Sequence, residues 1–355
     1  MRILQVIDVL EVGGAEKLLI TLSNLQNRNK DIVSIVTILR PGPLVKYLDP
    51  ELKLISLNRK WKFSPITMFR FVQIAKDYDL IHVHSSHNLR YVFLSLNIFF
   101  LKTKVVFHEH SGKININKQV KWYMRIIYTK INLIGVSQSI CNWAVNDCGI
   151  ESKKVHFLPN IIPFQKFSGH PQKKYDKIFF IATCNILRPK NIEFLIDLFV
   201  QINKNNLCKL SIVGQPYDKL YYDELKLKIS GLKYKNSIEF IHDCTNIQSI
   251  LHNYHFALHC SKFESGPLVL IEYLAQGVPF LSYRTGDIAE LLLNDFPEFI
   301  IDNFDLAKWN NALDKVMSLD RFETALTMRK FYENFFSEDS YYLKCNEIYK
   351  RVLGY

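Results

Sequence analysis

The sequence predicts an α/β protein with two doubly wound domains, in each of which helices cover both faces of a parallel sheet. Its 355 residues suffice for two domains of ordinary size, each with its own core. Short apolar strands alternate with helices of about ten to fifteen residues, a pattern typical of βαβ units. The alternation breaks at 155–177, where three prolines and a basic cluster indicate a linker. We therefore expect an N-terminal domain over 1–165 and a second domain over 166–335.

The first domain begins with a buried strand that runs into an amphipathic helix, and a second apolar strand follows. Three further apolar runs and a helix that ends at Gly149 complete the series. The predicted strands are 3–10, 31–39, 79–85, 104–110 and 132–137, and the predicted helices are 15–28 and 138–150.

The second domain repeats this pattern. Its predicted strands are 177–183, 209–214, 237–242, 255–261, 278–283 and 298–301, and its predicted helices are 191–204, 221–230, 246–253 and 267–276. A final helix over 336–355 is expected to pack back towards the first domain. Ligands of such sheets lie beyond the carboxyl ends of the strands, so the predicted site is a cleft between two facing domains.

The composition indicates an ordinary globular protein of a reducing compartment. Hydrophobic residues make up 48% and charged residues 22%. The seven cysteines form no C-x-x-C pair and are expected to be free, mostly buried thiols. The chain enters its first strand without a basic leader, so we expect no signal peptide. The longest apolar run, at 91–101, is too short and too polar to span a bilayer.

The net charge of +11 lies entirely in the first domain. Residues 1–165 contain 22 Lys and Arg against 11 Asp and Glu, so the remainder of the chain sums to zero. Much of the excess falls between Lys46 and Lys130, interleaved with aromatic residues. A basic, aromatic surface suits a membrane leaflet or a nucleic acid, and its alternative is a merely basic soluble surface.

Two turns offer groups that bind anions. Gly13-Gly14 lies between a strand and a helix, where backbone N–H groups can approach a phosphate, although a plain tight turn explains the glycines equally well. Arg188 and Lys190 fall in a later strand-to-helix turn, where a diphosphate could gather two cations, and the alternative is a solvated charged loop.

Five histidines occur at strand ends, at positions 82, 84, 87, 108 and 110. H-x-H on a strand puts both rings on one face, but no third ligand has convincing spacing for a metal. We expect a neutral imidazole that hydrogen-bonds a ligand hydroxyl. His82 lies inside its strand and best suits a core position.

Residues 263–279, "FESGPLVLIEYLAQGVP", contain two glutamates eight residues apart. Pro267 suits the first helical turn, and the residues before it would expose backbone donors to an anion. Glu272 would lie about a turn and a half inside the helix, where a carboxylate can accept from both hydroxyls of a ribose diol. Glu264 would precede the helix and face the group beyond the phosphates.

The segment 262–292 resembles the E-x7-E signature region of retaining sugar-nucleotide glycosyltransferases of family 4. Further segments resemble the family in its usual order along almost the whole chain: "GGAE", "DLIHVHS", "LIGVSQSI", "FLPNI", "RPKNIEFLI" and "KLSIVG". The resemblance implies the GT-B fold, in which two Rossmann-like domains face each other across a cleft. The C-terminal domain then holds the nucleotide sugar, and the N-terminal domain supplies most of the acceptor site.

The resemblance also implies roles for individual residues. The residues expected to bind the donor are Gly13, Gly14, Gly266, Pro267, Leu268 and Glu272. The residues expected at the reacting centre are Glu264, His110, Lys190 and Arg188, with His108 the second choice for the histidine near the sugar. The family usually has an arginine five residues before this lysine, where Asn185 stands here. Either Arg188 takes that role or the site has one cation fewer.

The activity implied by the resemblance is the retaining transfer of a hexosyl or N-acetylhexosaminyl group from a UDP- or GDP-linked donor. A glycan or polyprenyl-diphosphate-linked acceptor of bacterial surface polysaccharide synthesis (capsule, O-antigen or exopolysaccharide) is expected. We expect no metal cofactor, no nucleic-acid partner, and a cytoplasmic protein peripheral on the anionic inner face of the membrane. The alternatives are a sugar-nucleotide epimerase of the same fold and a non-catalytic sugar-nucleotide- or glycan-binding protein.

Overall fold

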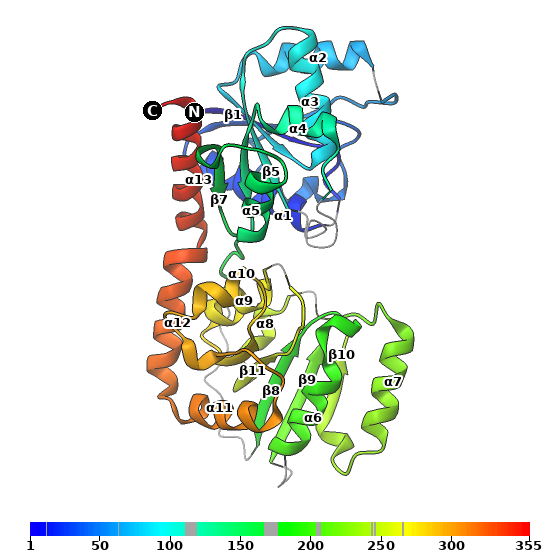
Figure 1. Ribbon diagram of the computed structural model, residues 1–355, viewed down its shortest axis with the longest axis vertical. Coiled ribbons are helices and arrows are strands. Elements are labelled where there is room, and N and C mark those ends of the chain that lie inside the picture. Colours follow the sequence, from blue (N-terminus) through cyan, green and yellow to red (C-terminus); the bar gives the residue numbers. More distant parts are fainter. Residues whose placement is uncertain are drawn as a thin grey trace. The chain divides into compact units, whose positions relative to one another are not determined.

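The computed structural model (Figure 1) describes residues 1–11, 13–62, 64–110, 119–166, 177–203, 207–242, 244, 246–264 and 266–355. The chain forms two compact units. One consists of Met1–Asn160 together with Glu338–Tyr355, and the other of Ile161–Ser337. The boundary between the units thus lies a few residues before the expected position at 165, and the C-terminal segment belongs to the first unit.

The sheet of the first unit has seven parallel strands in the order β3-β2-β1-β4-β5-β6-β7. Their bounds are β1 (Arg2–Ile7), β2 (Ile32–Thr37), β3 (Lys53–Ser56), β4 (Leu80–His84), β5 (Lys104–Glu109), β6 (Asn132–Gly135) and β7 (Val155–Phe157). Strands β1 and β4 are adjacent where the strand order reverses, the place at which open α/β sheets bind ligands. Both strands are almost wholly buried, which explains their continuous apolar runs.

Helices cover this sheet and follow the strands in alternation. Their bounds are α1 (Gly14–Arg28), α2 (Pro65–Ala75), α3 (Ser86–Ile98), α4 (Trp122–Tyr128), α5 (Gln138–Asn146) and α13 (Glu338–Leu353), with short 3-10 helices at Pro43–Tyr47 and Ser152–Lys154. Helix α13 contacts α1 and β5 and buries Tyr341 and Tyr349 in the first unit. Tyr342 donates a hydrogen bond of 2.9 Å to Asp31 and fixes the start of α13.

The sheet of the second unit has six parallel strands in the order β10-β9-β8-β11-β12-β13. Their bounds are β8 (Ile178–Thr183), β9 (Cys208–Val213), β10 (Ile238–Ile241), β11 (Phe256–His259), β12 (Phe280–Tyr283) and β13 (Ile300–Ile301). The helices are α6 (Ile192–Ile202), α7 (Lys219–Ser230), α8 (Gln248–Leu251), α9 (Leu268–Gln276), α10 (Gly286–Leu292), α11 (Leu306–Ser318) and α12 (Arg321–Phe336), with 3-10 helices at Arg188–Lys190, Lys235–Ser237 and Pro297–Phe299. The order reverses between β8 and β11, which are hydrogen-bonded neighbours.

The predicted fold class, two doubly wound parallel-sheet domains, is confirmed. The sequence analysis assigned no strand to β3 or β7, which are short edge strands with no fully buried residue. It also extended the last strand to 298–301, whereas Pro297–Phe299 forms a 3-10 turn and only Ile300–Ile301 pairs with β12. Pro267 is the residue that caps α9 rather than a member of its first turn.

The seven cysteines are all free, as predicted, and five of them are buried. Burial raises the pKa of Cys184 to about 12, so this thiol stays protonated at neutral pH. Among the described residues, none of the helices is long and apolar enough to cross a membrane.

Candidate functional site

The second unit brings Lys190 and Glu264 together from loops that follow two neighbouring strands. Lys190 ends the 3-10 turn after β8, and Glu264 follows β11. The backbone N–H of Lys262 donates to the carbonyl of Pro189 at 2.8 Å and joins the two loops. Glu264 N–H donates to Thr285 Oγ1 at 3.0 Å, which holds this loop against the start of α10. The pair therefore lies at the carboxyl edge of the sheet, where its strand order reverses.

Lys190 Nζ donates a short hydrogen bond to Glu264 Oε1, and both side chains are about four-fifths covered. His259 Nε2 lies 3.5 Å from the same oxygen, and its Nδ1 lies 3.0 Å from Ser282 Oγ. Burial by itself would raise the pKa of Glu264, but hydrogen bonding to His259 and the charge of Lys190 outweigh it. The pKa of Glu264 is therefore lowered to about 2, and the carboxylate is ionised at neutral pH.

Helix α9 carries the second glutamate of the signature. Glu272 lies in the second turn of α9 and is half-buried. Thr183 N–H donates to Tyr273 Oη at 3.2 Å and anchors α9 to the end of β8. Gly277, in the left-handed region at φ +64°, ends the helix, and a Cβ there would come within 2.8 Å of Ala325.

Gly266 precedes the helix cap in a different environment. A Cβ added there would meet only Ile288 at 3.9 Å, an ordinary contact. The protein itself therefore has room for a methyl group at this position. Leu268 opens the helix and Pro267 caps it, and the side chain of Pro267 makes no hydrogen bond to the first backbone N–H groups of α9.

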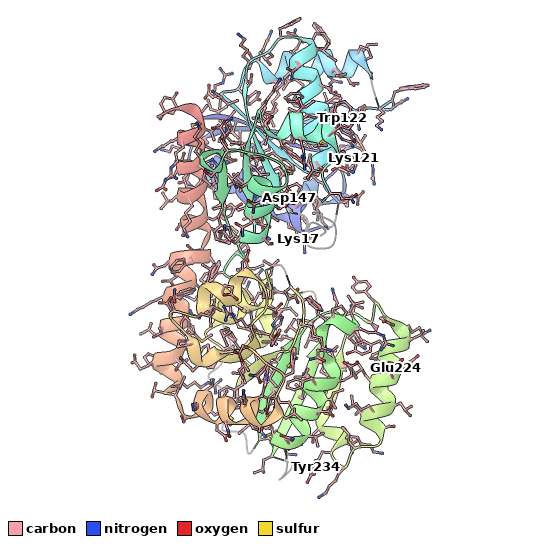
Figure 2. The ribbon with its side chains drawn as sticks, viewed as in Figure 1. Lys17, Lys121, Trp122, Asp147, Glu224 and Tyr234 are labelled. Carbon is pink, nitrogen blue, oxygen red and sulfur yellow. The ribbon has the colours of Figure 1, made fainter. Side chains whose placement is uncertain are left out.

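Arg188 does not join this cluster. Its guanidinium lies 2.8 Å from Glu224 Oε1 and 3.8 Å from Asp218 Oδ2 and packs over the ring of Tyr221. Figure 2 shows Glu224 on α7, so this ion pair joins Arg188 to that helix. The other sequence position of interest, Asn185, is exposed and accepts from Gln215 N–H at 3.5 Å. Of the two predicted cations, the structure thus brings Lys190 alone to Glu264.

Gly13 and Gly14 lie at the carboxyl end of β1 in the first unit. Gly13 caps α1 in an extended conformation, and a Cβ on Gly14 would meet nothing within 4 Å. Burial, together with the charges of Asp8 and Glu11, raises the pKa of Glu16 in the first turn of the helix. The turn therefore offers backbone N–H groups, but its neighbours are acidic.

Four of the predicted histidines, all but His87, form a buried cluster at the ends of β4 and β5. His82 and His84 stack with their centroids 4.4 Å apart, and His108 and His110 lie 4.1 Å apart. The ligand atoms of His82, His84 and His108 lie within 4.8 Å of one another, so the structure supplies the third residue that the spacing did not reveal. Hydrogen bonds between the rings and to Tyr349 and Gln5 engage every ring nitrogen of these three residues except His108 Nε2, which makes the cluster a network rather than an open ligand set.

One branch of this network starts at helix α13. Gln26 Nε2 donates to Tyr349 Oη at 3.2 Å, and Tyr349 Oη forms a short hydrogen bond with His82 Nδ1. His82 Nε2 is in turn hydrogen-bonded to His108 Nδ1 at 3.2 Å. His108 Nε2 has no hydrogen-bond partner among the described residues.

The other branch ends at His110. Gln5 Nε2 donates to Gln26 Oε1 at 2.9 Å, which leaves Gln5 Oε1 to accept from His84 Nε2 at 2.9 Å. His84 Nδ1 then accepts from His110 Nε2 at 3.0 Å. These bonds fix the neutral tautomer of His110 and leave its Nδ1 without a proton, as an acceptor.

Burial keeps all four rings neutral. It lowers the pKa of His82 and of His110 to about 3, and it lowers the pKa values of His84 and His108 well below the usual range. The expectation that His82 is a core histidine is confirmed, since its side chain is fully buried. Sequence reasoning missed Gln5, Gln26 and Tyr349, which lie far along the chain from the histidines that they hold. It also missed His259, which precedes Glu264 by only five residues.

Two family models match the chain. Residues 163–334 match the model of glycosyl transferases group 1, and residues 12–166 match that of glycosyltransferase family 4. The chain is built from these two glycosyltransferase domains. Together they cover 12–334, close to the two units of the structure.

Curated relatives and solved structures agree with this assignment. The chain is 24% identical over 321 residues to the UDP-Gal:alpha-D-GlcNAc-diphosphoundecaprenol alpha-1,3-galactosyltransferase of Escherichia coli, covering 78% of this chain and 79% of that protein. It is 22% identical over 250 residues to the phosphatidylinositol N-acetylglucosaminyltransferase gpi3 subunit of Schizosaccharomyces pombe, covering 67% of this chain but only 53% of that protein. The crystal structure of Anabaena HepE with UDP and glucose matches with a TM-score of 0.73 at 17% identity, over 99% of each chain. This structural likeness confirms the GT-B fold.

Proposed function

We propose that this protein is a retaining glycosyltransferase that moves a sugar from a UDP-linked donor to a lipid-linked acceptor in bacterial surface polysaccharide synthesis. The observation that carries the proposal is the cluster of Lys190, Glu264 and His259 beside the start of α9. The E. coli relative, which uses UDP-Gal and a diphosphoundecaprenol acceptor, supports this choice of donor and acceptor.

Departure of the nucleoside diphosphate builds negative charge on the β-phosphate while the sugar becomes oxocarbenium-like. Lys190 and the N–H groups at the start of α9 are the groups suited to stabilise that charge. Because protein groups supply this positive charge, the proposed reaction uses no metal ion. Glu264, kept ionised by its low pKa, would hold Lys190 in place and accept from the sugar hydroxyls.

The remaining proposed roles follow from hydrogen-bonding capacity. Glu272 would accept from both hydroxyls of the donor ribose, as the position of the second signature glutamate suggests. His110 would accept from a hydroxyl of the transferred sugar or the acceptor through its unprotonated Nδ1. Arg188 stands outside the proposed catalytic set because Glu224 and Asp218 hold its guanidinium.

The decisive experiment measures donor binding by thermal shift over UDP- and GDP-linked sugars, since a ligand of the folded state raises its stability. We expect a UDP-sugar to stabilise the wild type and to leave Glu272→Ala unaffected. Glu333→Ala, an exposed glutamate of α12, is the matched control and should behave as wild type. Equal stabilisation of Glu272→Ala and the wild type would contradict the proposed donor site.

Product analysis separates the proposal from its alternatives. Incubation with donor alone should leave the sugar unchanged, whereas an epimerase would convert it. With a lipid-linked acceptor, the anomeric configuration of the product, read by NMR, should match that of the donor. Tight donor binding without transfer or hydrolysis over a broad acceptor panel would instead indicate a non-catalytic binding protein.

We further propose that the first unit binds the anionic face of a membrane. Trp122 is 75% exposed on α4, next to the exposed Lys121 and near Arg125, as Figure 2 shows for Trp122 and Lys121. Lys118, part of the same basic stretch, lies outside the described residues. Charge reversal at Lys121 and Arg125 should release the protein from vesicles that contain phosphatidylserine. Unchanged partitioning would refute the membrane proposal.

A further inference from the structure

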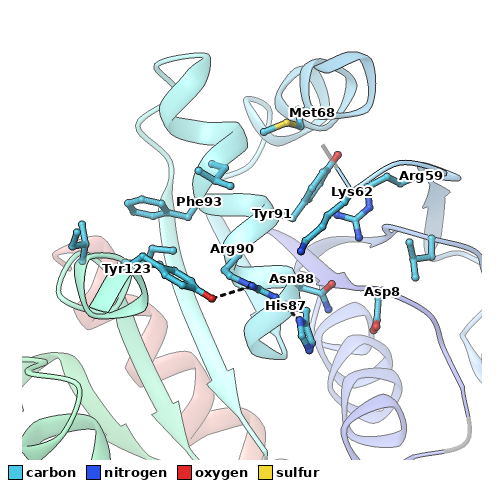
Figure 3. Close-up of a pocket in the computed structure, with 14 residues that line it drawn as sticks. Asp8, Arg59, Lys62, Met68, His87, Asn88, Arg90, Tyr91, Phe93 and Tyr123 are labelled. Atoms are coloured by element: carbon cyan, nitrogen blue, oxygen red, sulfur yellow. Dashed lines mark hydrogen bonds between the residues drawn. The ribbon is translucent and has the colours of Figure 1, made fainter. Parts of the chain in front are cut away.

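A cavity of about 790 Å³ lies within the first unit, between the carboxyl edge of its sheet and helices α2, α3 and α4 (Figure 3). Asp8 and Arg59 reach it from the loops after β1 and β3, and His87 reaches it from the first turn of α3. This is the edge at which the histidine network ends. The volume lies within the range of about 300–1,000 Å³ that small-molecule sites occupy.

One side of the cavity is cationic. Arg59, Lys62 and Arg90 line it, and Figure 3 shows Lys62 and Arg90 with His87 near its centre. Arg90 is held by His87 Nδ1 and by Tyr123 Oη, the latter at 3.5 Å. The guanidinium of Arg59 lies 4.8 Å from the centre of the Tyr91 ring. Side chains held in this way are oriented for a phosphate, to which guanidinium groups donate in pairs.

The other side of the cavity is apolar and opens to the surface. Phe93 and Ile127 line it, with Leu94 and Ile126 at its exposed edge, 36% and 49% exposed. Exposed apolar side chains continue from this edge over the same three helices: Ile66, Phe69, Ile98 and Trp122. An apolar chain that leaves the cavity therefore meets further apolar surface instead of water.

A second cavity, of about 190 Å³, shares His87, Arg90 and Tyr123 with the first and adds Lys121. Arg90 therefore stands between two cavities, one of them largely apolar and the other lined by more polar groups. A ligand with a charged head and a long apolar tail satisfies both ends at once, whereas a free anion leaves the apolar wall unused.

We propose that this pocket binds an amphiphile that carries a phosphate or diphosphate on a long apolar chain. Its phosphate contacts Arg90, Lys62 and Arg59, and its chain runs along Phe93 and Ile126 towards the surface. This assignment rests on the proposed function, because such a molecule is the lipid part of a lipid-linked acceptor. The positive charge and the apolar lining together favour this amphiphile over a single-stranded nucleic acid. A single strand would need a groove that follows its backbone and aromatic side chains on which its bases stack.

Farnesyl diphosphate is the probe for this site, since it carries both parts of the proposed ligand without forming a bilayer. Isothermal titration of the full chain should show binding at least tenfold tighter than that of inorganic diphosphate or of farnesol, the two halves of the probe. Equal affinity for inorganic diphosphate would reveal a simple anion site, and the absence of binding by farnesyl diphosphate would overturn the proposal.

Substitutions locate the two halves of the ligand. Arg90→Gln with Lys62→Gln should weaken farnesyl diphosphate binding about tenfold or more, because charge-assisted hydrogen bonds are lost. Ile126→Ser with Leu94→Ser should also weaken it, while leaving the weak affinity for inorganic diphosphate unchanged. Both pairs are at least partly exposed, so the fold should persist. Lys102→Gln, an exposed cation outside the pocket, is the control. Unaltered binding by both pocket variants would place the probe elsewhere and overturn the assignment.

Transfer assays keep this test apart from that of the proposed function. If the chain does not transfer sugars, binding of farnesyl diphosphate and its loss in the variants remain measurable. If it does transfer sugars but the pocket is wrongly assigned, the KM for a lipid-linked acceptor will be equal in the wild type and in the Arg90→Gln, Lys62→Gln variant. We expect that KM to rise about tenfold, with the KM for the donor unchanged.

Discussion

The candidate residues of the two units occupy equivalent places and use opposite electrostatics. In each unit they lie at the carboxyl edge of a parallel sheet, near the point where the strand order reverses. In the first unit, burial removes the charge from four histidines, whose rings are hydrogen-bonded to one another in pairs. In the second unit, Lys190 and His259 keep Glu264 charged in spite of its burial.

Burial alone therefore does not decide whether a site residue is charged; its hydrogen-bond and charge partners decide it as well. A histidine surrounded by other neutral rings has no counter-charge and gives up its proton. A carboxylate beside an ammonium keeps its charge, since the attraction outweighs the desolvation penalty. The first arrangement suits recognition of hydroxyl groups, and the second suits a reaction in which charge moves.

Acidification should have the largest effect, because four histidines that are neutral in the folded chain take up protons when it unfolds. Their pKa values lie below the ordinary 6.5 in the folded chain, so the unfolded chain binds more protons below about pH 6.5 and the folded state loses stability there. Glu264 has a folded pKa of about 2 against the ordinary 4.5, so its contribution is lost only below about pH 4.5. We therefore expect the first unit to open first as the pH falls.

Hydrogen exchange with mass spectrometry, at neutral pH and at about pH 5, measures this order peptide by peptide. Peptides of β4 and β5 should lose protection, while those of β8 and β11 retain it. Earlier loss of protection in the second unit would contradict the electrostatic contrast between the two sites.

Replacing Lys190 by Met should remove the ion pair with Glu264 in the second unit. Without the ammonium group, Glu264 loses a partner that lowers its pKa, and the departing phosphate loses its nearest cation. We expect kcat to fall by about 100- to 1,000-fold, the usual cost of losing one group that stabilises transition-state charge. Lys226→Met removes an exposed lysine that pairs with Asp223 on α7 and should leave the rate unchanged. A Lys190→Met enzyme with wild-type kcat would exclude the proposed role.

Replacing Tyr349 by Phe should destabilise the histidine network of the first unit. The change removes the hydroxyl that accepts from Gln26 and is hydrogen-bonded to His82, both of them buried. Leaving such groups unpaired costs about 1–3 kcal/mol of unfolding free energy, measured by urea titration. Because His110 is held through the same network, kcat should fall as well, by less than in the Lys190 variant. Tyr355→Phe, at an exposed tyrosine, is the control and should change neither the unfolding free energy nor kcat. Equal urea midpoints for Tyr349→Phe and the wild type would show that the network does not stabilise the fold.

Gly266→Ala should have the smallest effect, on donor binding alone and not on the stability of the fold. The fold accommodates the methyl group 3.9 Å from Ile288, so the unfolding midpoint should stay close to that of the wild type. The donor KM should rise about tenfold, because the methyl group occupies the space through which a phosphate approaches the start of α9. Gly277→Ala is the contrasting control, since its clash with Ala325 and its positive φ predict lost stability. A Gly266→Ala protein with unchanged donor KM would remove this glycine from the donor site.

The sequence predicted the strands that are buried on both faces of their sheet, because such strands are continuous apolar runs. Strands such as β1 and β4 are continuous apolar runs and were found directly. The edge strands β3 and β7 carry no such signal, because their residues are half-buried and they span only four and three positions. The family resemblance assigned Lys190 and Glu264 to one site, but neither it nor any local pattern predicted that these residues, 74 positions apart, form an ion pair.

The histidine network shows the limit of spacing arguments. His82 and His84 share a strand, so their common face follows from the period of two. His108 comes from the next strand, and only the β4–β5 register, in which His84 lies opposite His108, brings it to the same place. Tyr349 lies 267 residues beyond His82, and no pattern in the sequence connects the two.

The membership of α13 in the first unit has a consequence for biosynthesis. The strands that carry the histidines are made early, but the hydroxyl that orients His82 is added only after the whole second unit has been translated. Domains generally fold in the order in which they leave the ribosome. Here the first unit must wait, with Gln26 and His82 lacking their partner, until α13 emerges. Synthesis of α13 is therefore required to complete the histidine network, and a chain that ends before α13 lacks the hydroxyl that bonds Gln26 and His82.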